Sequence, residues 1–255
     1  MNFKEVKMID GAGNKRPYAD RTPTTVRGNV TDIICIGFTP NDGSCPAENT
    51  LVSFVANTSR NNLNNSANPT SGDKLKLGTE QFFSVGESSP TFNRMRASYS
   101  YFIPTKLIKL TKGCRSSESA SEDCPQTIAL QLKAGTILGE LPPYEAFCLG
   151  GTSSVRGWGA CELGVSKSYV EGTIEHRFPI WRMLSGALFV DAGSDLGTQK
   201  DVPGKPGTLL QKSGSGYSLG GGVGIKTPIG PLRLDVASQD LSGDWRYTLG
   251  VGWKF

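Results

Sequence analysis

The chain offers few residues that could carry chemistry, and the most distinctive is one arginine set among glycines. Arg156 lies within residues 147–161, a stretch with four glycines between two segments of strand-like pattern. Because glycines let the backbone turn tightly on both sides of a single charged tip, this stretch is predicted to be a folded-in hairpin. Its guanidinium would present a planar fork of donors to carboxylates. The alternative is an exposed glycine-rich connector.

The remaining candidates do not predict an enzyme. The single histidine, His176, falls on the apolar face of an expected strand, with no cysteine, serine or aspartate arrangement beside it. The glycine-rich run at 220–225 opens no helix, as a dinucleotide-binding loop would have to. Consecutive glycines at inward positions instead indicate close backbone packing or a bend. No metal site and no cofactor are expected.

Six cysteines form three pairs of near neighbours in the sequence. The pairs are Cys35 and Cys45, Cys114 and Cys124, and Cys148 and Cys161, and none has the Cys-x-x-Cys spacing. Such spacing suits local disulfides better than a zinc site, and unpaired buried thiols are the alternative. Disulfides imply an oxidising compartment. The N-terminus has no apolar core of a signal peptide, so we expect either a fragment of a longer precursor or a targeting route that is not encoded here.

The elements that must position these residues are predicted to be strands. Only 37% of the 255 residues are hydrophobic, and no run approaches the roughly 18 apolar residues of a spanning helix. A net charge of +4 without a basic block argues against nucleic acid as a partner. Apolar and polar residues instead alternate in segments joined by alternately short and long connections, at 3–9, 52–57, 75–85, 94–103, 128–134, 170–178, 185–193, 217–227, 232–236 and 245–255. This pattern predicts an all-β, antiparallel, up-and-down transmembrane β-barrel of about ten strands, in contact with membrane lipid.

The last segment alternates most clearly. Its apolar face ends on an aromatic residue at the chain terminus, and its other face is small or charged. The apolar face consists of Trp245, Tyr247, Leu249, Val251, Trp253 and Phe255. From Tyr247 onward it resembles the C-terminal sorting signal of outer-membrane barrels, which the assembly machinery recognises.

Residues 154–158, Ser-Val-Arg-Gly-Trp, resemble the Val-Arg-Gly-aromatic signature of the BamA-type outer-membrane family. This family includes two-partner secretion transporters and the chloroplast import channel. Residues 59–62 and 68–72 resemble pieces that form a short periplasmic turn in this family, and residues 138–146 are similar to its cyanobacterial and plastid branch. The resemblance implies that Val155, Arg156, Gly157 and Trp158 tip an extracellular loop that folds back into the barrel.

In that family the hairpin arginine pairs with acidic side chains inside the barrel. The matching positions are Glu175 and the Phe189-Val-Asp-Ala-Gly193 segment with Asp191. Glu175 and Asp191 also fall on the polar faces of neighbouring expected strands, which supports the pairing. The alternative is three unrelated solvated charges.

The resemblance covers nearly the whole chain, residues 1–255, as one C-terminal barrel portion. Family barrels have about sixteen strands, and a barrel of about ten has little room for a hairpin. The soluble POTRA domains that precede family barrels are absent from the sequence. We therefore expect a truncated member, a fragment, or a subunit that a second chain completes.

The function that the resemblance implies is the insertion or translocation of client polypeptides at a bacterial outer membrane, in particular a cyanobacterial one, or at the plastid outer envelope. The alternative is a passive structural pore or remnant that lacks assembly activity. POTRA domains encoded upstream of Met1 would favour the first function.

Overall fold

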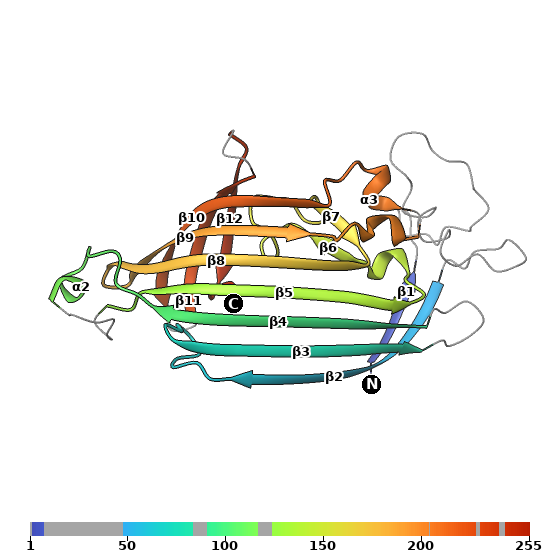
Figure 1. Ribbon diagram of the computed structural model, residues 1–255, viewed down its shortest axis with the longest axis horizontal. Helices are drawn as coiled ribbons and strands as arrows, with labels where there is room; N and C mark the ends of the chain where they lie inside the picture. Colours follow the sequence, from blue (N-terminus) through green and yellow to red (C-terminus); the bar gives the residue numbers. More distant parts are fainter. Residues whose placement is uncertain are drawn as a thin grey trace, which may run out of the picture.

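The computed structural model describes residues 2–7, 48–83, 91–116, 124–203, 205–227, 230–239 and 243–255. Ten of its strands form one curved sheet in which every neighbouring pair is antiparallel (Figure 1). In sheet order they are β1 (Asn2–Lys7), β2 (Glu48–Asn61), β3 (Gly72–Phe83), β4 (Phe92–Pro104), β5 (Thr127–Gly139), β8 (Ser168–Trp181), β9 (Leu184–Ser194), β10 (Ser215–Thr227), β11 (Gly230–Ser238) and β12 (Trp245–Val251). The expected all-β, up-and-down fold is confirmed.

The period-two alternation decides which face of the sheet each side chain occupies. Large apolar side chains on the convex face are exposed, among them Ile174 at 56%, Leu132 at 55% and Leu249 at 70%. Their chain neighbours point to the concave face, where Glu175 and Asp191 are fully buried. A sheet with an apolar outside and a polar inside is the arrangement of a membrane barrel wall.

The connections alternate in length from one end of the sheet to the other. Long segments link β5 to β8 and β9 to β10, and they hold η1 (Pro143–Glu145), β6 (Phe147–Leu149), β7 (Gly164–Ser166), η2 (Thr198–Asp201) and α3 (Pro206–Leu209) at one end. The opposite end has the two-residue connection at 182–183 and an insert with α2 (Lys112–Ser116) (Figure 1). No helix within the described ranges is long and apolar enough to cross a bilayer.

The sheet is open along β1 and β12. These strands stand at the two ends of the sheet order, and no ladder joins them in the described part of the chain. The sequence predicts that ten strands do not close alone around their hairpin, and the observed sheet agrees with that prediction.

A small hydrophobic core lies where the long connections meet the concave face. It joins sheet residues to residues of the β6–β7 hairpin and η2, and its members include Leu51, Phe82, Phe92, Ile137, Leu149, Val155, Leu163 and Val202. This core fixes the base of the hairpin, because burying a large apolar side chain stabilises by about 1.5–3 kcal/mol.

Some predicted boundaries were wrong. The turn expected at 179–184 is only 182–183, because β8 continues through a bulge at Pro179. The last strand ends at Val251, and not at Phe255. Residues 30–38, whose sequence favours a hairpin arm within a long loop, and residues 86–90, whose glycine and proline favour a turn, lie outside the described residues.

Candidate functional site

The connection between β5 and β8 folds back over the concave face, as the sequence predicts. Its two short strands, β6 and β7, pair from Phe147 to Ser166, so the hairpin extends five residues beyond the predicted end at 161. A disulfide between Cys148 and Cys161, with the Cα atoms 4.5 Å apart, ties its arms together. The tip turns at Gly157, whose φ of 87° favours glycine.

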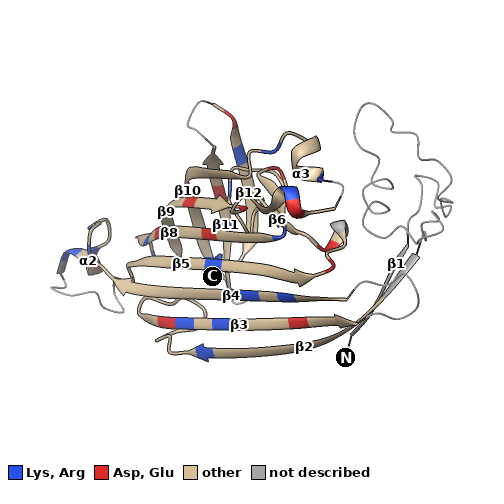
Figure 2. Cartoon of the chain, turned by 45° about the vertical axis from the view of Figure 1, so that its right-hand side comes forward, with Lys and Arg blue, Asp and Glu red and all other residues tan. Residues whose placement is uncertain are grey.

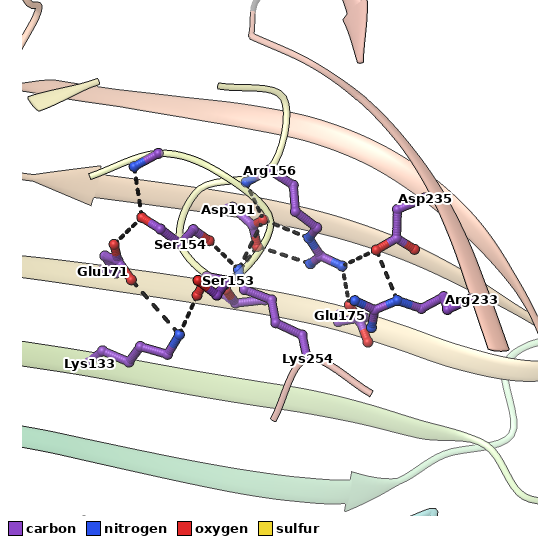
Figure 3. Close-up of polar contacts among 12 residues, drawn as sticks. Lys133, Ser153, Ser154, Arg156, Glu171, Glu175, Asp191, Arg233, Asp235 and Lys254 are labelled. Carbon is purple, nitrogen blue, oxygen red and sulfur yellow. Dashed lines mark hydrogen bonds and ion pairs between the residues drawn. The ribbon is translucent and has the colours of Figure 1, made fainter. Parts of the chain in front are cut away.

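Arg156, at the hairpin tip, is 1% exposed and surrounded by carboxylates from three strands (Figure 3). Its Nε and Nη2 donate to the two oxygens of Asp191 on β9, at 2.8 and 3.0 Å. Its Nη1 donates to Glu175 on β8 at 2.7 Å and to Asp235 on β11 at 3.3 Å. The backbone N–H of Arg156 also donates to Asp191 at 3.1 Å. The Arg–Asp contact is therefore bidentate, the strongest form of this pair.

Each of these acids has a second basic partner, so the cluster is an alternating network. The second partners are Arg177 for Glu175 at 2.7 Å, Arg233 for Asp235 at 2.9 Å and Lys254 for Asp191 at 3.1 Å. Burial disfavours a charged guanidinium, but the hydrogen bonds to Asp191 and the charge of Glu175 outweigh it and raise the pKa of Arg156 above its ordinary value. Arg156 therefore stays charged at the hairpin tip.

Phe189 and Gly193, the other predicted lumen partners, shape the seat for the hairpin. The Arg156 guanidinium lies over the Phe189 ring, 3.3 Å from its centroid. Val155 is fully buried, and a Cβ added at Gly193 would lie 2.8 Å from its side chain. A side chain at position 193 would thus displace the hairpin.

Trp158 and Gly157 complete the docked motif. The Trp158 Nε1 donates to the carbonyl oxygen of Tyr217 at 3.1 Å. A Cβ at Gly157 would lie 3.2 Å from the Ser218 Cβ and 3.3 Å from the Ala237 Cβ. The tip therefore rests directly on β10 and β11.

Four members of the network were missed by sequence reasoning. Arg177, Arg233 and Asp235 lie on the polar faces of their strands, and their position in the alternation could have identified them as candidates. Lys254 could not be found in this way, because its contacts arise from a turn at Gly252, whose φ is 84°. Its Nζ also donates to the Ser154 carbonyl oxygen at 2.5 Å and to the Thr173 hydroxyl at 3.0 Å.

The same turn corrects the prediction for the C-terminal segment. Tyr247, Leu249 and Val251 face outward and are exposed, as expected. Trp253 and Phe255 do not continue this face. Their rings lie 4.4 and 4.8 Å from the Arg177 guanidinium carbon, on the concave side of the sheet.

The other predicted site residues lie apart from this network. A disulfide joins Cys114 of α2 to Cys124, with the Cα atoms 4.8 Å apart, whereas Cys35 and Cys45 lie outside the described residues. The His176 ring lies beside Phe178, with their centroids 5.4 Å apart. Within the described ranges, no group of three or more histidine, cysteine, aspartate or glutamate side chains could hold a metal.

Comparisons with known proteins agree with this geometry. The family model described as the Omp85 superfamily domain matches residues 2–255. The chain is similar to outer envelope protein 80, chloroplastic, of Arabidopsis thaliana, at 41% identity over 128 residues, which are 50% of this chain and 17% of the relative. It is also similar to protein TOC75-4, chloroplastic, of Arabidopsis thaliana, at 33% identity over 205 residues, which are 80% of this chain and 48% of the relative.

Among solved structures, the chain is similar to BamA from Haemophilus ducreyi lacking POTRA domains 1–3. The TM-score is 0.55 at 17% identity, over 83% of this chain and 43% of that chain. At this identity the match shows the fold alone. The chain spans about half or less of the length of each of these relatives.

Proposed function

The chain belongs to the Omp85 superfamily, and from this premise we propose that it acts in the insertion or translocation of polypeptides at an outer membrane. It resides in the outer membrane or in the plastid outer envelope, and relatives named as chloroplastic outer envelope proteins support the second location. We propose that the chain is a single domain, a part of the barrel wall together with its hairpin, and that it catalyses no reaction.

The observation that carries the proposal is the docked hairpin. Arg156 draws three acids from β8, β9 and β11 onto one loop tip. The tip thus bridges four consecutive strands of the wall, β8 to β11, from the inside. The ion pairs of Arg156 and the hydrogen bonds of Trp158 and Lys254 give the tip one defined docked position, for which a passive pore has no need.

We further propose that a second chain or additional strands complete the barrel. An open sheet edge in hydrocarbon leaves backbone donors and acceptors unpaired, and each costs several kcal/mol. Client polypeptides and membrane lipid are the other partners. Native mass measurement of the chain in detergent should show an assembly larger than one chain. A stable monomer with both edges protected from hydrogen exchange would overturn this part.

Reconstitution tests the main proposal. Liposomes that contain the purified chain should accelerate the folding of a denatured client barrel, followed by its altered gel migration before and after boiling. Arg156→Ala should reduce this acceleration while the chain itself remains folded in the liposome. If the liposomes conduct ions but fold clients no faster than empty liposomes, the passive-pore alternative is correct.

A further inference from the structure

Basic side chains on the concave face fall into two groups with different surroundings. Over β8 to β11 and the C-terminal tail, each basic member of the Arg156 network has a carboxylate partner. Over β3 and β4, Lys76 and Arg96 have no ion pair among the described residues. The nearby carboxylate of Glu80 lies 3.6 Å from Arg94 and accepts a hydrogen bond from Ser53. Figure 2 shows basic positions on both of these adjacent strands, offset from one another along the strand direction.

The strand register leaves space around these two charges. Lys76 is opposite Ser98, and Arg96 is flanked by Gly78 and Gly135 on its two neighbouring strands. Because these cross-strand partners are small, the concave face has a hollow of about 450 Å³ here, lined by Lys76, Arg94, Arg96, Lys133 and Tyr169 among others. Both Lys76 and Arg96 are exposed to it.

The docked hairpin forms one side of this region and holds two of the groups in place. The Arg96 guanidinium carbon lies 5.8 Å from the centroid of the Phe147 ring, which itself packs on Tyr169 with centroids 4.7 Å apart. Lys133 donates to the Ser153 carbonyl oxygen at 2.6 Å. Arg96 is thus oriented by an aromatic face, and its donor fork remains available to a carboxylate.

We propose that this hollow binds an acidic polypeptide segment in an extended conformation. Lys76 and Arg96 are diagonal cross-strand neighbours, and such pairs are about 7–8 Å apart. Alternate side chains of an extended chain are separated by nearly the same distance, about 7 Å. Carboxylates at alternate positions therefore reach both charges at once, whereas a single phosphate reaches one. That this segment belongs to a client polypeptide rests on the proposed function.

Peptide binding to the folded chain in detergent tests the site. The probe is a fluorescent peptide of alternating glutamate and threonine, with a glutamine–threonine peptide and a lysine–threonine peptide as controls. Fluorescence anisotropy at low salt should show binding of the acidic peptide alone. Arg96→Gln and Lys76→Gln should each weaken it about tenfold, the loss that follows from one charge-assisted contact. Arg96→Lys should retain part of the affinity.

The matched control is Lys200→Gln, which removes an exposed basic side chain from η2 and should leave binding unchanged. Equal effects of Arg96→Gln and Lys200→Gln would overturn the site. If inorganic phosphate displaces the peptide at comparable concentration, the hollow is a small-anion site and not a site for an extended polypeptide. A chain that binds the acidic peptide but fails to accelerate client folding overturns the proposed function and leaves this site standing.

Discussion

Removing the Arg156 side chain should release the hairpin tip without unfolding the sheet. Deleting one partner of a buried ion pair costs about 3–5 kcal/mol. Because each of the three acids keeps a second base at 2.7 to 3.1 Å, the cost should be near the lower limit. About 3 kcal/mol is roughly a hundredfold change in the docking equilibrium. Arg156→Ala should therefore populate the undocked hairpin about a hundredfold more than the unchanged protein does.

Amide hydrogen exchange measures this opening directly. The Arg156 N–H donates to Asp191 on β9 and therefore reports docking. The Gly151 N–H donates to the Trp158 carbonyl oxygen within the hairpin and reports whether the undocked tip keeps its internal fold. Exchange at residues 150–163 should accelerate roughly a hundredfold in Arg156→Ala. The exchange rate of Arg156→Lys should fall between those of the unchanged protein and Arg156→Ala, because an ammonium keeps the charge but cannot replace the bidentate guanidinium fork.

A second arginine provides the matched control. Arg246 also joins the sheet to the hairpin, through Glu162 at 2.9 Å, but its side chain is 46% exposed. Exposed pairs contribute about 0.2–1 kcal/mol, so Arg246→Ala should accelerate exchange no more than about fivefold. The losses in Arg156→Ala and Asp191→Ala should combine to less than their sum. The ion pairs of Arg156 with Asp191 and Glu175 are called the ionic lock. Additive losses of docking free energy, or equal effects of Arg156→Ala and Arg246→Ala, would show that this lock does not hold the hairpin.

Three further predictions concern the neighbours of the lock. Lys254→Gln should free the C-terminal tail for carboxypeptidase and accelerate hairpin exchange about tenfold or more, because it removes the ion pair with Asp191 and the charge-assisted hydrogen bond to the Ser154 carbonyl oxygen of the hairpin; an unchanged digestion rate contradicts this. Gly157→Ala should displace the tip more than Gly151→Ala. Both glycines have positive φ, but an added Cβ would lie 3.2 Å from its nearest neighbour at position 157 and 3.5 Å from it at position 151. Equal hairpin exchange rates in the two variants would show that packing at the tip does not matter. Replacing Cys114 and Cys124 by serine should loosen the α2 insert by about 3 kcal/mol at most while the heat-dependent gel migration persists; loss of that migration would mean that the insert supports the whole sheet.

Alternation in the sequence predicted the sheet because its period of two is a local property. It assigned Glu175 and Asp191 to the polar face, and the structure places both against Arg156. The odd or even position of a residue in the alternation predicts which face of the sheet its side chain occupies. It does not predict how far along the barrel wall that side chain lies. Asp235 has the correct parity, but only the register from β9 through β10 to β11 places it at the height of the Arg156 guanidinium.

The C-terminal tail shows where the pattern misleads. Trp253 and Phe255 continue the apolar alternation without a break in the sequence. Gly252 falls at a position where glycine is ordinary in a strand facing a crowded lumen, so nothing local marks it as a turn. The turn is stabilised by contacts with Arg177 and Asp191, which are more than sixty residues away along the chain. Such long-range contacts have no local signature.

The order of these contacts along the chain constrains how the lock assembles. Arg156 precedes every acid that it contacts, and Asp235 follows it by 79 residues. A hairpin tip with one buried guanidinium is unfavourable until carboxylates surround it. β8 and β9 supply two of them, and the third arrives only when β11 has paired with β10. Complete docking therefore requires most of the C-terminal sheet to be in register, so that a strand slipped by one residue would turn its acid to the lipid face and leave the hairpin undocked.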